Sequence, residues 1–264
     1  MLYYASMSYT PESAYESTYP FDINPNTAVD IPTYQARLAL WHSGAPINLD
    51  GGVVVAKVQV PNEQISTLLN NSQDVYTQLS IPGSGYLLGA HEKRFKSLAP
   101  QAKAVVYGLH ATFREIVRLD AERSSLLAPN AIAGTTSIGL FSGEDNWHCD
   151  GWTSSKTDME RSDQLFGNGL LRYTLSVGAP GTELLAGRLQ KNQIVDGFLL
   201  DETTRTDNNL LESTPHSALE VVRFVSDYDV HRAPRLKTAI ARYFTTASVL
   251  LPLSEASRVQ VSIA

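Results

Sequence analysis

Cysteine is almost absent from this 264-residue sequence, which carries only Cys149. A single cysteine cannot form an internal disulfide, and this favours a reducing compartment. No apolar run approaches the roughly 20 residues that a membrane-spanning helix needs. The N-terminal stretch lacks the basic start and the continuous apolar core of a signal peptide. Together these absences predict a cytoplasmic protein that does not span a membrane.

Positive charge is also scarce. The sequence has 21 Lys and Arg against 27 Asp and Glu, a formal net charge of -6, and no run of basic residues forms a stripe. Nucleic acid is therefore not an expected partner. There is no internal repeat and no low-complexity linker, and 43% of the residues are hydrophobic, enough for a sizeable core. We expect one domain over residues 1–264.

The first 130 residues contain most of the helical signals. The predicted elements are an irregular arm over 1–30, short helices at 34–42 and 61–69, a β-branched strand at 53–60 and a long helix at 101–127. The long helix is predicted because apolar residues recur at helical spacing and form one stripe. The stripe consists of Ala102, Val105, Val106, Leu109, Phe113, Ile116 and Val117.

From residue 131 onward the pattern changes to short β-like runs separated by turns. These runs are 131–141, 147–152, 170–177, 194–200, 219–225, 230–233, 239–251 and 258–263. The polar segment 201–214 is expected to be a loop. Short strands with turn signals predict a sandwich, barrel or jelly roll. The fold class is therefore α+β, with N-terminal helices supporting a β core.

A histidine and a carboxylate lie two residues apart at His148 and Asp150. On an extended strand they would share a face and could approach one metal ion together. The expected third ligand is His231, with His216 as its rival. Two histidines and one carboxylate typically hold non-heme Fe(II). No catalytic residue is expected beyond these ligands. The alternative makes His148 a packed histidine and Asp150 a turn residue.

The spacing of His148-x-Asp150, then His231, then Arg242 resembles the iron- and 2-oxoglutarate-dependent dioxygenase superfamily. The resemblance covers roughly residues 130–252. It implies a double-stranded β-helix (jelly roll, cupin-like) core over 131–264. It also implies Fe(II) held by His148, Asp150 and His231, and 2-oxoglutarate bound through its distal carboxylate by Arg242.

The sequence differs from the common pattern of this family at one position. Many members follow the arginine with a hydroxyl residue two positions later, where this chain has Phe244. Thr246 and Ser248 share the strand face with Arg242, and Thr246 is expected to contact the cosubstrate in its place. Residues 172–183 resemble the strand and turn that often follow the first ligand pair. Tyr173 in that segment is the third expected cosubstrate contact, and Glu183 is expected to be structural.

Four residues are candidates to line a substrate pocket, namely Trp147, Trp152, Arg172 and Arg235. Arg235 also competes with Arg242 for the cosubstrate carboxylate. The expected reaction is hydroxylation, or another oxidation at carbon, of a small or medium-sized molecule by dioxygen. Two alternatives stay open. One is a cupin-like metal-dependent oxidase or isomerase without 2-oxoglutarate, and the other is a non-catalytic jelly-roll module that binds a ligand.

Overall fold

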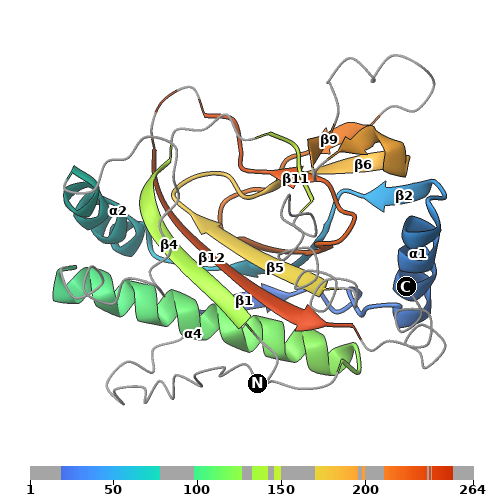
Figure 1. Cartoon of the computed structure of the whole chain (residues 1–264). Coiled ribbons are helices and arrows are strands. Elements are labelled where there is room, and N and C mark those ends of the chain that lie inside the picture. Colours follow the sequence, from blue (N-terminus) through green and yellow to red (C-terminus); the bar gives the residue numbers. More distant parts are fainter. Residues whose placement is uncertain are drawn as a thin grey trace, which may run out of the picture.

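A computed structural model describes residues 19–77, 98–126, 133–141, 146–149, 170–195, 198–199, 211–236, 238 and 240–251. Two antiparallel sheets face each other, the helices over residues 62–77 and 100–123 cover the outer side of the larger one, and the helix over residues 31–43 lies beside the smaller one (Figure 1). The helices are α1 (Ile31–Ser43), α2 (Asn62–Thr77) and α4 (Pro100–Arg123). Among the described residues, no helix is long and apolar enough to cross a membrane.

The larger sheet has six strands in the order β1-β3-β10-β5-β12-β4. These strands are β1 (Phe21–Ile23), β3 (Val53–Val58), β10 (Glu220–Val225), β5 (Leu170–Val177), β12 (Ile240–Leu250) and β4 (Ala133–Phe141). In the smaller sheet, β6 pairs with β11, β2 and β9. These strands are β6 (Glu183–Leu189), β11 (His231–Arg232), β2 (Ile47–Asp50) and β9 (Glu212–Thr214). A β-bridge between His148 and His231 adds segment 146–149 beside β11.

The order of these strands identifies the fold. From β4 to β12, eight segments of these two sheets follow one another in the chain, with 146–149 as the second. The two-residue strands β7 (Ile194–Val195) and β8 (Phe198–Leu199) form a separate two-stranded sheet and are not counted among them. Numbered in that way, the core of the larger sheet reads 1-8-3-6 and the smaller sheet reads 2-7-4-5. This is the strand order of a jelly roll, in which the chain passes between two facing sheets. The structure thus confirms the expected fold class.

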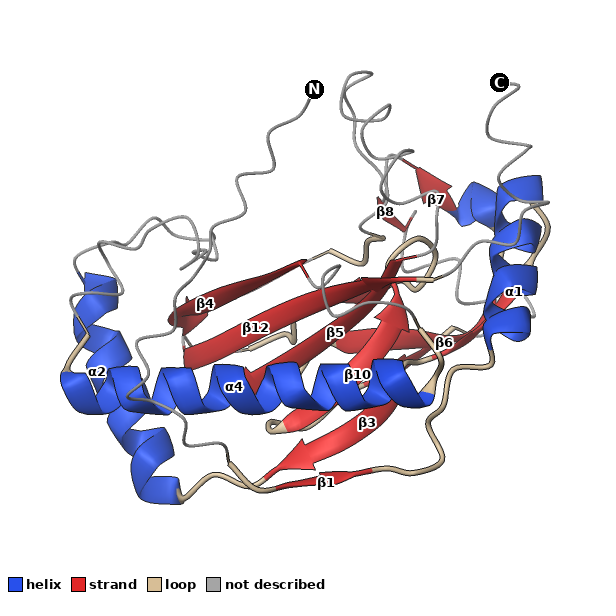
Figure 2. Ribbon diagram, turned by 90° about the horizontal axis from the view of Figure 1, so that it is seen from below, coloured by secondary structure: helices blue, strands red, loops and turns tan. Residues whose placement is uncertain are grey.

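Helix α4 supports the larger sheet from outside the roll (Figure 2). The predicted apolar stripe is buried as a continuous row, from Ala102 to Val117. Apolar residues of β5 and β12, including Leu175 and Val249, belong to the same core cluster. Burial of such a stripe against a sheet is the main source of stability for an amphipathic helix. The helix ends at Arg123, with Ser124 as its C-cap, a few residues before the predicted boundary.

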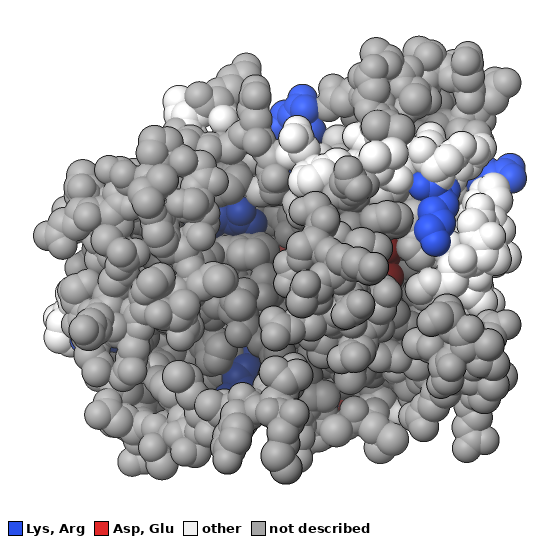
Figure 3. Space-filling model, in the orientation of Figure 1, with Lys and Arg blue, Asp and Glu red and all other residues white. Residues whose placement is uncertain are grey.

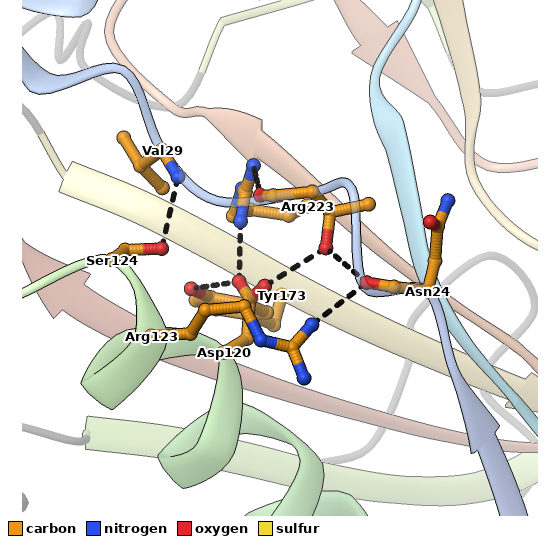
Figure 4. Close-up of polar contacts among 8 residues, drawn as sticks. Asn24, Val29, Asp120, Arg123, Ser124, Tyr173 and Arg223 are labelled. Carbon is orange, nitrogen blue, oxygen red and sulfur yellow. Dashed lines mark hydrogen bonds and ion pairs between the residues drawn. The ribbon is translucent and has the colours of Figure 1, made fainter.

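A buried ion pair fastens this helix to the sheet (Figure 4). The carboxylate of Asp120 in α4 binds the guanidinium of Arg223 in β10 and accepts a hydrogen bond of 2.9 Å from the Tyr173 hydroxyl. Thr27 completes the group, because its hydroxyl donates to Asp120 at 3.2 Å and its carbonyl accepts from Arg223 at 2.7 Å. The N-terminal arm, predicted as irregular, is thus tied to both helix and sheet over 19–30, and residues 21–23 form β1.

Several elements differ from the sequence-based expectation. Strands β1, β2 and β6 were not predicted, and β9 forms at the end of the segment expected to be a loop. The single strand predicted at 194–200 is instead a pair of two-residue strands, β7 (Ile194–Val195) and β8 (Phe198–Leu199). Strands β1, β2 and β9 are short and pair with distant segments, β1 with β3 and the other two with β6, and a local sequence pattern does not contain such pairing. The run predicted at 258–263 lies outside the described residues.

Candidate metal and cosubstrate site

Two of the three predicted metal ligands are neighbours in the structure. His148 and His231 face each other on adjacent antiparallel segments and exchange two backbone hydrogen bonds of 2.9 Å. Their ring centroids are 4.5 Å apart, with a tilt of 53° between the ring planes. Cross-strand partners project from the same side of a sheet. The pairing therefore places both imidazoles on one face, as the predicted site requires.

That face is the interior of the roll. His231 is directly opposite Leu184 in β6, so the two side chains share a side of the smaller sheet. Leu184 packs with Val222 and Phe224 of the larger sheet in a small buried cluster. The ring of Phe224 lies 4.8 Å from that of His231. The histidine pair thus lies between the two sheets.

The hydrogen bonds of the two rings select one tautomer. Nδ1 of His148 lies 2.8 Å from the Asn146 carbonyl oxygen, and Nδ1 of His231 lies 2.9 Å from the Asp229 carbonyl oxygen. A carbonyl can only accept, so Nδ1 donates in both neutral rings and the lone pair resides on Nε2. Metal-ligating histidines commonly have their second ring nitrogen committed to a backbone carbonyl in this way. The donor chemistry of this pair therefore fits a divalent metal bound through Nε2.

The predicted carboxylate ligand, Asp150, lies outside the described residues, as does Trp152. Within the described parts of the chain, no group of three or more His, Cys, Asp and Glu converges on a possible ion. The role of Asp150 therefore remains a prediction from the sequence. Cys149, between the two predicted ligands, is buried in the apolar core.

His216, the rival third ligand, has a different environment. Its Nε2 lies 2.9 Å from the carbonyl oxygen of Gly51, to which it donates. Its Nδ1 is 4.0 Å from a carboxylate oxygen of Glu220. His216 thus joins the turn between β2 and β3 to the segment after β9. His231, and not His216, pairs with His148 in a β-bridge, and this favours His231 as the metal ligand.

Arg242 is buried inside the roll, with 6% of its surface exposed. Its Nε donates a hydrogen bond of 2.9 Å to Ser176 Oγ, and its guanidinium carbon lies 4.2 Å from the centre of the Phe244 ring. Ser176 in turn donates to the Ala179 carbonyl at 2.9 Å. Stacking on one side and a hydrogen bond at Nε together fix the plane of the guanidinium.

The contacts of Arg242 show which residue lies where many members of the resembled family have a hydroxyl residue, two positions after the arginine. Phe244 occupies that position and stacks with the guanidinium. The neighbouring hydroxyl comes instead from Ser176 of β5, which is directly opposite Phe244 in the sheet. Nothing in the sequence predicts this contact, because the register between β5 and β12 cannot be read from either strand alone.

Further polar side chains of β5 and β12 lie on the same face as Arg242. Thr246 is directly opposite Thr174, whose hydroxyl lies 3.4 Å from that of Thr182 at the start of the smaller sheet. Thr246 therefore shares the roll interior with Arg242, as the alternation along a strand predicts, and its contact with the cosubstrate stays a prediction. Arg172 also occupies this face, opposite Phe224, and is half-buried.

Tyr173 lies on the opposite side of the larger sheet, contrary to the expectation that it contacts the cosubstrate. Its hydroxyl donates to Asp120 of α4, and it is directly opposite Arg223. Successive residues of a strand point to opposite faces, so Arg172 and Tyr173 could not both line the interior. Burial, and then the negative charge of Asp120, hold the pKa of Tyr173 well above its ordinary value, and the phenol remains a donor.

The two remaining pocket candidates also lie away from the roll interior. Trp147 is buried on the outer face of the smaller sheet, where the guanidinium of Arg232 stacks 4.1 Å from its ring. Arg235 follows β11 and is exposed. The burial of Arg242 inside the roll thus distinguishes it from its rival Arg235. An aromatic residue that was not predicted, Phe198, lies near the pair, with its ring 6.2 Å from that of His148 and half of its surface exposed.

Basic side chains do not form a continuous surface in the view of Figure 3. There the Lys and Arg side chains of the described residues are separated from one another. Proteins that bind nucleic acid usually carry a clustered basic stripe. The part of this face that the structure describes shows no such stripe.

No family model matches the sequence, and no curated protein matches it. Several solved structures are similar. AviO1 from Streptomyces viridochromogenes Tue57 is 11% identical, with a TM-score of 0.39 over 83% of this chain and 95% of that one. The Kdo hydroxylase KdoO, a non-heme Fe(II) alphaketoglutarate dependent dioxygenase, is 11% identical, with a TM-score of 0.38 over 87% of each chain. A Pseudomonas putida prolyl-4-hydroxylase is 10% identical, with a TM-score of 0.34 over 86% of this chain and 98% of that one.

These similarities are too weak to identify an activity, since a shared fold does not imply a shared function. The strand order by itself identifies the jelly-roll fold.

Proposed function

We propose that this protein is an Fe(II)- and 2-oxoglutarate-dependent dioxygenase that oxidises a carbon atom of a small or medium-sized substrate. The observation that carries the proposal is the His148–His231 pair. Both rings face the roll interior, and in both rings Nδ1 donates a hydrogen bond to a backbone carbonyl. Asp150, two residues after His148 in the sequence, is proposed as the carboxylate ligand. Two histidines and a carboxylate leave coordination positions open on Fe(II).

Arg242 is the proposed anchor of the cosubstrate. A guanidinium binds a carboxylate through two parallel N–H···O bonds when its plane is fixed. Ser176 and Phe244 fix that plane here. Thr246 and Thr174 add hydroxyl groups to the same face of the sheet. These contacts suit a small, polar, doubly charged acid such as 2-oxoglutarate inside the roll.

The protein residues have limited roles in this proposal. When bound, iron, 2-oxoglutarate and dioxygen would supply the oxidising chemistry. The histidines would present Nε2 lone pairs, and Arg242 would orient the keto acid and compensate its distal charge. The packing of Phe224 and Leu184 beside His231 would exclude water from one side of the site.

An anaerobic titration tests the proposal. Fe(II) and then 2-oxoglutarate are added to the apoprotein, and the visible charge-transfer absorption of the chelated keto acid is followed. We expect saturable absorption with one equivalent of each. Arg242→Ala should weaken 2-oxoglutarate binding by about 1.5–3 kcal/mol, or roughly ten- to hundredfold, while Fe(II) still binds. Arg235→Ala is the matched control and should bind normally.

The outcomes separate the alternatives. Fe(II) binding without any response to 2-oxoglutarate would favour a cupin-like oxidase or isomerase. Failure to bind any divalent metal would favour a ligand-binding module. Normal affinity in Arg242→Ala, with a loss in Arg235→Ala, would reassign the cosubstrate anchor.

A further inference from the structure

Behind the two histidines, the outer face of the smaller sheet carries a second row of side chains. His148 pairs with His231, and His231 pairs with Leu184, which places Trp147 opposite Arg232 and Arg232 opposite Glu183. The inner row is thus His148–His231–Leu184, and the outer row is Trp147–Arg232–Glu183. Each member of the outer row is adjacent in the chain to a member of the inner row.

The outer row is held together by close contacts. Nε of Arg232 donates to Glu183 at 2.8 Å, and its Nη2 lies 2.7 Å from the same carboxylate oxygen. The guanidinium carbon lies 4.1 Å from the centre of the Trp147 ring. Trp147 and Arg232 are only 4% and 7% exposed. The guanidinium therefore joins three neighbouring segments from a position largely removed from water.

Backbone hydrogen bonds of the segment that carries His148 reach two neighbours, β11 and Leu199. Its described backbone bonds to β11 are the two exchanged by His148 and His231, and Leu199 adds a bond of 2.9 Å to the Trp147 carbonyl. A slip by one residue would move His148 to the outer face and Trp147 to the interior. Because residues beside a hydrogen-bonded pair form the closest side-chain pair, Trp147 and Arg232 are well placed to oppose that slip.

We propose that Trp147, Arg232 and Glu183 are positioning residues that hold His148 and His231 in register and at their observed separation. Arginine suits this position because its planar guanidinium can stack flat on an indole while its N–H groups bind a carboxylate in the plane, and the compact ammonium of lysine lacks this planar fork. The inference rests on the proposed function in treating the pair as metal ligands. The effect on the rings, however, is a property of the apoprotein and can be measured without metal.

The test combines two measurements on Arg232→Lys, Trp147→Phe and Arg232→Met/Glu183→Gln. The first is the nitrogen NMR spectrum of histidine-labelled apoprotein at mildly alkaline pH, which reports the tautomer of each ring. The second is anaerobic Fe(II) affinity, measured below the unfolding transition of each variant. Arg188→Met is the matched control, because Arg188 is an exposed arginine of β6 in the same sheet.

We expect the row variants to remain folded, to lose the Nδ1-protonated signals of one or both rings, and to bind Fe(II) ten- to hundredfold more weakly. Losses of this size are typical when residues that orient metal ligands are changed. Arg232→Lys should retain part of the affinity, and Arg188→Met should match the unaltered protein. If the double variant does not fold, the two milder substitutions decide the question.

The result also distinguishes this inference from the proposed function. Unchanged ring spectra and unchanged Fe(II) affinity in Arg232→Lys and Trp147→Phe would overturn the positioning role, even in a protein that binds iron. Ring spectra that depend on the row, in a protein that binds no divalent metal, would support the positioning role and overturn the proposed function.

Discussion

Replacing Asp120 by alanine should strongly destabilise the fold. The carboxylate is fully buried and binds Arg223, Tyr173 and Thr27, which belong to three different parts of the chain (Figure 4). Without it, Arg223 would keep a buried positive charge with no counter-ion. Breaking a buried ion pair in this way costs about 3–5 kcal/mol. For a protein of this size, that loss lowers Tm by roughly 6–20 °C.

Urea unfolding followed by circular dichroism would measure the change. Glu115→Ala is the matched control on the same helix, because its carboxylate binds the partly exposed Arg118 at 2.6 Å. An exposed pair of this kind contributes about 0–1 kcal/mol. The double variant Asp120→Leu/Arg223→Met should recover most of the stability lost in Asp120→Ala, because it leaves no unpaired charge. A loss below about 1 kcal/mol in Asp120→Ala would refute the reasoning.

Two further predictions concern the region around Arg242. Ser176→Ala should weaken 2-oxoglutarate binding several-fold without loss of Fe(II), since the hydrogen bond to Arg242 Nε contributes about 1 kcal/mol. Calorimetric titration would measure the affinity for 2-oxoglutarate, and an unchanged affinity would mean that Phe244 alone orients the guanidinium. Gly178→Ala should lower stability by more than about 1 kcal/mol in thermal unfolding. Its φ is +88°, and a Cβ would lie 2.8 Å from the Ala241 carbonyl oxygen. A variant as stable as the unaltered protein would show that this turn accommodates a side chain.

Where apolar residues recur with one local period, the sequence was sufficient to predict the helix or strand. The helical stripe ending near Val117 predicted α4 almost to its boundaries, and the run 170–177 is β5. The strand predicted at 239–251 is β12, and its arginine is buried in the roll as expected. The period of the apolar residues follows directly from which face of a helix or strand is buried. It can therefore be recognised without knowing the segment against which that face packs.

Contacts between strands were not legible in the same way. Ser176 approaches Arg242 only because β5 and β12 pair in one particular register. Tyr173 was assigned to the wrong face, because the sequence did not say which alternate residues of β5 point inward. The pairing of Trp147 with Arg232 depends on a single bridge between segments far apart in the chain. Such contacts are fixed by tertiary structure, which local propensity does not encode.

The most direct test of the proposed site is anaerobic Fe(II) binding to the unaltered protein and to His148→Ala, His231→Ala and His42→Ala. His42 is an exposed histidine of α1 and serves as the control. We predict one tightly bound Fe(II) in the unaltered protein and in His42→Ala, and its loss in both other variants while circular dichroism remains unchanged. Full retention of iron in folded His148→Ala or His231→Ala would contradict the assignment of this pair as metal ligands.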